Sequence, residues 1–227
     1  MKASKLLLTC VLVAMAAASF GQFGGGGGFG RGGGRNAMNP GGLLSRDDVK
    51  KDLNLTNDQL DQITKIQEDA QQAMRDRMQG VDFQSMSDDD RQKMMAEGMK
   101  AAEATSDQIE AVLTKDQHAR LLGIFIQLNG NNAIQSKEIQ ALLSITDAQK
   151  AKIKDLQAKQ QDAMRSNFQK VQSGELQWSD MRPIMTKLRT VMGDELGKIL
   201  TETQKSKMTS LEGAKFTPVD DQPGAPG

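Results

Sequence analysis

The sequence Leu55-Thr56-Asn57-Asp58-Gln59 recurs 90 positions later as Ile145-Thr146-Asp147-Ala148-Gln149, and this repetition decides how the chain folds. A second pair of related motifs, Leu113-Thr114-Lys115-Asp116-Gln117 and Leu200-Thr201-Glu202-Thr203-Gln204, is offset by 87 positions. Two pairs of motifs in the same order predict a tandem duplication. We place the first repeat over residues 43–129 and the second over residues 130–216.

Apolar residues in both repeats recur at helical spacing, as Leu60, Ile63 and Ile66 illustrate. No stretch alternates with the period of a strand, and the residues after Leu43 are rich in good helix formers. The sequence therefore predicts an all-α fold of two helical-hairpin units with long antiparallel helices. We expect helices over 46–52, 57–79, 88–112 and 115–128 in the first repeat, and over 137–143, 147–172, 180–199 and 202–212 in the second.

Each Leu/Ile-Thr-x-x-Gln motif is typical of the start of a helix. The threonine hydroxyl would accept from the backbone N–H of the glutamine, and the glutamine side chain would return to the backbone N–H of the threonine. Taken singly, such a capping box needs no function, so we assign these residues a structural role. They are Leu55, Thr56, Gln59, Leu113, Thr114, Gln117, Ile145, Thr146, Gln149, Leu200, Thr201 and Gln204.

The two ends of the chain differ in character from the repeats. Residues 1–21 combine two lysines with a short apolar run, which predicts a cleaved signal peptide that would remove Cys10. Residues 22–42 are dominated by glycine and predict a disordered linker, and residues 217–227 predict a disordered tail. We therefore expect a protein secreted across an inner membrane into the periplasm or the extracellular space, with no integral membrane span.

The charge balance and the residue inventory exclude several functional classes. Four of the 29 basic residues precede Leu43, which leaves 25 basic against 29 acidic groups in the remainder, and this balance argues against nucleic-acid binding. His118 is the only histidine, and no cysteine follows Cys10, so neither a histidine-based triad nor a metal site is predicted. We expect no enzymatic activity and no cofactor.

Methionine is unusually frequent and admits three interpretations. Flexible thioethers suit a surface that binds varied partners, but at helical spacing they also fill ordinary cores, and methionine clusters bind Cu(I) in some proteins. Because Met94 and Met95 are adjacent in a predicted helix, their side chains cannot both face the core, so at least one should be partly exposed. The candidate client-binding residues are Met74, Met78, Met94, Met95, Met99, Phe168, Met181 and Met185.

The order and spacing of the four motifs resemble the Spy/CpxP family of periplasmic proteins, over residues Leu43 to about Phe216. The resemblance implies an ATP-independent chaperone or envelope-stress protein whose partners are unfolded or stress-released proteins. Family members pair as antiparallel dimers that form a cradle, so two units in one chain imply a monomer with an internal pseudo-dimer, with a homodimer as the alternative. A second interpretation is a structural or signalling accessory that docks one specific envelope partner.

Overall fold

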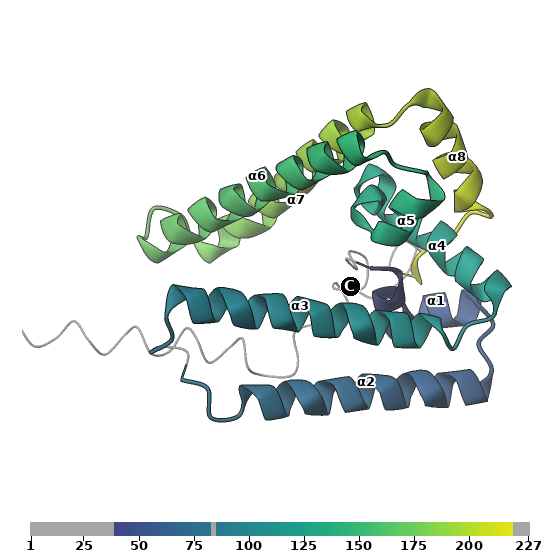
Figure 1. The fold of residues 1–227 in the computed structure, drawn as a ribbon, viewed down its shortest axis with the longest axis horizontal. Helices are drawn as coiled ribbons and strands as arrows, with labels where there is room; N and C mark the ends of the chain where they lie inside the picture. The colour runs from purple at the N-terminus through teal and green to yellow at the C-terminus, as the bar shows by residue number, and fades with distance from the viewer. Residues whose placement is uncertain (1–38, 83–84, 220–227) are drawn as a thin grey trace, which may run out of the picture. The chain divides into compact units, whose positions relative to one another are not determined.

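The computed structural model describes residues 39–82 and 85–219, and this part of the chain is all-α, with no strand among the described residues (Figure 1). The predicted signal peptide, most of the predicted linker and residues 220–227 lie outside it. The elements of the first half are η2 (Pro40–Ser45), α1 (Asp47–Asp52), α2 (Asn57–Met78), α3 (Asp88–Glu110) and α4 (Lys115–Asn129). Those of the second half are η3 (Gly130–Gln135), α5 (Lys137–Leu142), α6 (Asp147–Gln172), α7 (Trp178–Ile199) and α8 (Glu202–Glu212).

The helix boundaries predicted from the sequence agree with these bounds to within two residues, but the two 3₁₀-helices were not predicted. The η2 helix overlaps the predicted linker, because Pro40 and Gly41 are buried rather than disordered. At the other end, Pro218 is buried and the backbone N–H of Val219 donates to Asp48 at 3.1 Å. Ordered structure therefore begins before Leu43 and continues past Phe216.

All four threonines cap their helices as predicted, each in a reciprocal capping box with its glutamine. At the start of α2, for example, the N–H of Gln59 donates to the Thr56 hydroxyl at 3.2 Å. The Thr56 N–H in turn donates to the Gln59 side-chain oxygen at 3.1 Å. The motifs thus fix where α2, α4, α6 and α8 begin.

The glutamines also join the two motifs of each half, which the sequence analysis did not anticipate. Gln59 Nε2 donates to Gln117 Oε1 at 2.7 Å, and Gln117 Nε2 donates to Gln59 Oε1 at 3.0 Å. Gln149 and Gln204 form the same reciprocal amide pair at 2.7 and 3.0 Å. Each pair connects the start of the first long helix to the start of the closing helix, which gives a physical reason why the motifs occur in twos.

The hydrophobic core is centred on α4, the most buried of the long elements. Residues 121–126 of this helix are all buried, and α4 packs against η2, η3 and α8. Gly123 allows the closest approach, because a Cβ atom there would lie 2.6 Å from the carbonyl oxygen of Glu212. Elements from both halves therefore contribute to one core.

The long helices form two hairpins, in which α2 runs beside α3 and α6 beside α7 (Figure 1). Only Ile63 is buried in α2 and only Ile153 in α6, and these two isoleucines occupy equivalent positions. Most of each hairpin therefore lies outside the core. None of the described helices is long and apolar enough to cross a membrane.

The segment after α8 returns to the first half of the chain. The side-chain nitrogen of Gln127 donates to the carbonyl oxygen of Glu212 at 2.7 Å, and its side-chain oxygen accepts from the N–H of Phe216 at 2.7 Å. The Phe216 side chain is buried in the common core. This segment therefore contributes to the core with which α4 also packs.

Candidate functional site

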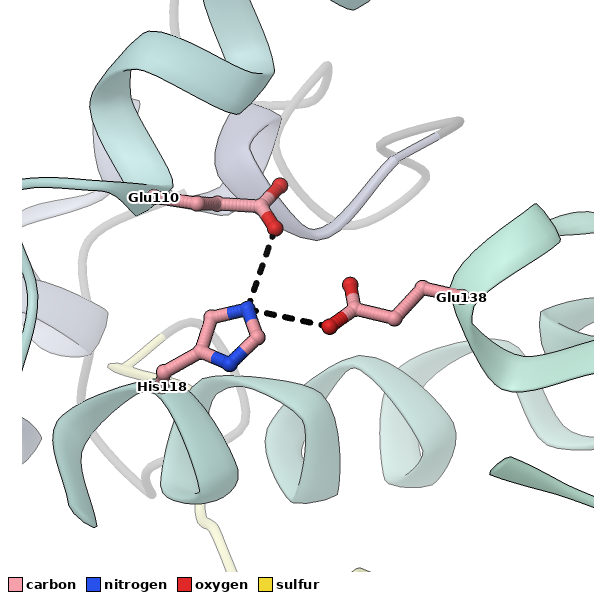
Figure 2. Close-up of side chains that lie close together, drawn as sticks. All are labelled: Glu110, His118 and Glu138. Atoms are coloured by element: carbon pink, nitrogen blue, oxygen red, sulfur yellow. Dashed lines mark hydrogen bonds and ion pairs between the residues drawn. The ribbon is translucent and has the colours of Figure 1, made fainter. Parts of the chain in front are cut away.

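Three titratable side chains meet at the junction of α3, α4 and α5. Glu110 is the last residue of α3, His118 lies in the first turn of α4, and Glu138 is in the first turn of α5. His118 Nε2 is 3.1 Å from Glu110 Oε2 and 3.1 Å from Glu138 Oε1. Figure 2 shows both carboxylates directed at the same ring nitrogen. We call these three residues the Glu–His–Glu cluster.

The Glu110 carboxylate is held from behind by two donors. The backbone N–H of Gly41 donates to Glu110 Oε1 at 2.9 Å, and the hydroxyl of buried Ser106 donates to the same oxygen at 2.8 Å. Gly41 allows this approach because it has no side chain: a Cβ atom there would lie 2.3 Å from the Ser106 hydroxyl oxygen. One oxygen of Glu110 is therefore fixed, and the other faces His118.

The position of His118 follows from the motif that precedes it. Gln117 belongs to the capping box of Thr114 and to the reciprocal glutamine pair, so the first turn of α4 is fixed on both counts. The next residue is His118, whose backbone N–H donates to the carbonyl oxygen of Thr114 at 2.9 Å. The helix cap therefore also sets the imidazole in place.

The electrostatics of the cluster are those of a crowded, partly buried group. Burial raises the pKa of Glu138, the neighbouring Glu110 carboxyl raises it further, and His118 acts in the opposite direction. A single N–H at Nε2 cannot satisfy two carboxylates at once, since it is one donor. The second carboxylate is therefore left without a hydrogen atom from this nitrogen.

His118 is the only histidine of the sequence, but in the structure it is not isolated from other candidate ligands. Its two neighbours come from the end of another helix and from the second half of the chain, at positions that no short motif connects. Each of the three residues offers one ligand atom, and these atoms all lie within 4.8 Å of one another. One imidazole nitrogen and two carboxylate oxygens are ligands that divalent transition metals accept in proteins.

The predicted client-binding residues differ in how far they are exposed. Met74 and Met99 are strongly exposed, with 62% and 61% of their surface accessible. Met78, Phe168 and Met185 are also exposed, Met94 is half-buried, and the side chain of Met95 lies outside the described part of the structure. Five of the eight therefore lie on the surface of the two hairpins.

Met181 is buried, so its prediction as a binding residue is wrong. It shares a helix face with the half-buried Ile184 and Leu188, and α7 packs against α6 along the hairpin. The interpretation of the methionines as core residues thus holds for this one.

Trp178 is an exposed apolar residue that the sequence analysis did not select. Its side chain is 56% exposed and makes an edge-to-face contact with Phe168, with ring centroids 5.2 Å apart. The sequence analysis placed Trp178 ahead of the helix, whereas α7 begins at Trp178 because Asp180 accepts from the backbone N–H of Gln177 at 2.9 Å. The tryptophan therefore faces Phe168 across the turn of the second hairpin.

In comparisons with known proteins, no family model, curated protein or solved structure matches the chain. The functional argument consequently depends on two features of the molecule itself. One is the set of exposed apolar side chains on the hairpins, and the other is the Glu–His–Glu cluster.

Proposed function

We propose that this protein is an exported, ATP-independent binding protein of the Spy/CpxP type that holds apolar segments of non-native proteins on its helical hairpins. The observation that carries the proposal is the exposure of large apolar side chains on both hairpins, led by Met74, Met99 and Trp178. An exposed methionine or tryptophan is unremarkable alone, but several on elements with little core of their own indicate a binding surface.

The chemistry of these residues suits varied partners. Methionine side chains are unbranched and polarisable, so they adapt to different apolar shapes at little steric cost. Charged and amide side chains occupy much of the rest of each hairpin surface, and residues 71–80 of the first hairpin are all exposed. A client would therefore meet apolar positions set among charged and amide groups, which favours weak, reversible contact over tight complex formation.

The proposal is tested by measuring light scattering of several unrelated denatured proteins in the presence of substoichiometric purified chain. We expect aggregation to be slowed, and to be slowed less by the variant Met74→Gln/Met99→Gln/Trp178→Gln. These side chains are exposed, so the substitutions should leave thermal stability nearly unchanged. A matched control is Val219→Gln, which removes an apolar side chain that is 48% exposed but lies outside both hairpins.

Three outcomes would contradict the proposal. They are failure of the native chain to slow aggregation of any client, suppression of only one client, and equal suppression by the triple variant. Suppression confined to one protein would favour the second interpretation, an accessory that docks a single envelope partner.

Two further measurements test the proposed export and the proposed monomeric state. Export predicts that the secreted protein begins near Gln22, which N-terminal sequencing would show. The two repeats within one chain favour a monomer with an internal pseudo-dimer, so the solution mass should match one chain. A homodimer would contradict this arrangement without bearing on client binding.

A further inference from the structure

We propose that Glu110, His118 and Glu138 form a binding site for one divalent transition-metal ion, best matched by Zn²⁺. The inference is independent of client binding, because the cluster lies at the core end of α3 and α4 and not on the exposed methionines. Zinc is bound in proteins by histidine nitrogen and by carboxylate oxygen, and sites with three protein ligands keep a fourth position for water.

The distances within the cluster already approach those of a zinc site. Ligand atoms about 2.1 Å from a tetrahedral ion lie about 3.4 Å apart. The ring nitrogen of His118 is 3.1 Å from an oxygen of each glutamate. An ion could therefore be accommodated by small side-chain rotations, without movement of the helices.

The hydrogen bonds behind Glu110 would orient it as a ligand. Gly41 and Ser106 both donate to Oε1, which leaves Oε2 directed at the imidazole. Supporting donors of this kind fix the orientation of ligands in known metal sites and raise their affinity for the ion. The arrangement thus includes supporting contacts as well as three candidate ligands.

Two residues of the cluster, His118 and Glu138, are also accessible from solvent, whereas the Glu110 side chain is only 13% exposed. A surface hollow of about 530 Å³ is lined by His118 and Glu138 together with Arg120, Leu142 and Leu211. About a third of the surface of the His118 and Glu138 side chains is accessible to solvent. Lys115 and Arg120 are the basic residues that line this hollow, and Arg120 is paired with Asp52 at 2.7 Å, which directs its charge to that carboxylate.

The second half of the chain does not repeat the cluster. By the offsets of the repeats, Gly197 stands where Glu110 would be, and Lys205 stands where His118 would be. The first-half equivalent of Glu138 is Asp48, which is paired with Arg46. The ligand set is therefore a property of this single junction, where an ion would link α3 and α4 of the first half to α5 of the second.

The test is isothermal titration of the full chain, made metal-free with a chelator and carrying no polyhistidine tag, with ZnCl₂ as the probe. We expect one ion per chain with a dissociation constant in the micromolar range or tighter, and a rise in Tm on addition of Zn²⁺. Cobalt(II) should give the visible absorption of a low-symmetry site with nitrogen and oxygen ligands.

Variants locate the ion. His118→Gln and Glu138→Gln should each weaken binding by at least tenfold, and Ser106→Ala should weaken it by about 10-fold through the orientation of Glu110. The matched control Glu195→Gln, which removes a partly exposed carboxylate that pairs with Lys198 in α7, should leave the affinity unchanged. Because Glu138 is partly exposed and glutamine has the same shape, this variant should fold, and circular dichroism would verify it.

Millimolar affinity would overturn the site, and so would binding that survives the loss of His118 or of Glu138. Neither result would affect the aggregation assay, so the proposed function and the metal site fail separately.

Discussion

The two halves of the molecule have the same order of helices, but they differ in the side chains at the contact between the 3₁₀-helix and the second long helix. In the first half, the 3₁₀-helix contributes Gly41 and the long helix contributes the polar side chains of Ser106 and Glu110. In the second half the long helix carries the glycines, Gly193 and Gly197. The side chains there come from the 3₁₀-helix instead.

The geometry of this exchange is complementary. A Cβ atom on Gly193 would lie 2.8 Å from the amide nitrogen of Asn132, and one on Gly197 would lie 2.4 Å from that of Asn131. Both halves thus keep a close contact between the same two elements, but the polar side chain comes from opposite sides. Only the first arrangement places a carboxylate on the long helix, where it reaches His118. The two junctions therefore differ in their polar side chains although the same two elements are in contact in both.

The largest effect is expected from forcing the second-half residue into the first half. Gly41→Asn would place a side chain against buried Ser106, including its backbone oxygen 3.0 Å from the new Cβ. Overpacking of this kind costs about 3 kcal/mol at the upper end of its usual range. Urea unfolding should show the loss.

The control for this prediction is the same substitution in a chain that also carries Ser106→Gly and Glu110→Gly, which recreates the second-half arrangement. Gly41→Asn should cost at least about 1 kcal/mol less in that background, since contacting residues couple by this order of magnitude. An equal cost in both backgrounds would mean that the two junctions are not equivalent.

The glutamine pairs should respond alike, because they match in both halves. Gln117→Ala removes the donor to the Gln59 side chain and to the backbone carbonyl of Leu53. Gln204→Ala removes the donor to the Gln149 side chain and to the backbone carbonyl of Leu143. We expect each to lower the free energy of unfolding by about 2 kcal/mol. Thr114→Ala, which removes only a cap, should cost about 1 kcal/mol. A loss confined to one half would break the equivalence of the motifs.

Asp48 and Glu138 stand at equivalent positions, yet their pKa values are displaced in opposite directions. The Arg46 guanidinium hydrogen-bonds the Asp48 carboxylate and lowers its pKa, with a further contribution from the Val219 N–H. A lowered folded-state pKa stabilises the fold above the unfolded-state pKa, and this stabilisation is lost as pH falls through the folded-state value.

Asp48→Asn should therefore cost about 1 kcal/mol at pH 7 and progressively less as the pH falls below 4. Unfolding measured across pH 2.5–7 in native and variant chains would show the two curves converging in acid. Parallel curves would show that Asp48 gains nothing from Arg46 in the folded state.

The smallest effect is expected at Lys205, the second-half equivalent of His118. Lys205 pairs with Glu202 at 2.7 Å, but both side chains are largely exposed. Exposed pairs contribute well under 1 kcal/mol, so Lys205→Ala should change stability by less than about 0.5 kcal/mol. A larger loss of stability that does not change with salt concentration would indicate that the methylene groups of Lys205 contribute by packing.

Local features were predictable from sequence and relationships between distant residues were not. The capping threonines and the apolar spacing define the helix starts, because both act within one or two turns. The first 3₁₀-helix, η2, was not predicted because Gly41 and Gly42 resemble linker residues, although at Gly41 the missing side chain is what permits close packing. The Glu–His–Glu cluster depends on how α5 packs near α4, which no local pattern encodes.

The segment from Gly213 to Val219 has a consequence for the order in which the chain acquires structure. A ribosome releases α1 and α4 long before Phe216 and Val219 exist, yet Phe216 packs in the core and the backbone N–H of Val219 donates to Asp48, 171 positions away. Contacts of such separation form late and slowly. The first half thus remains incomplete until residues 213–219 have been synthesised. Delaying its folding to that point therefore loses little structure that it could have completed earlier.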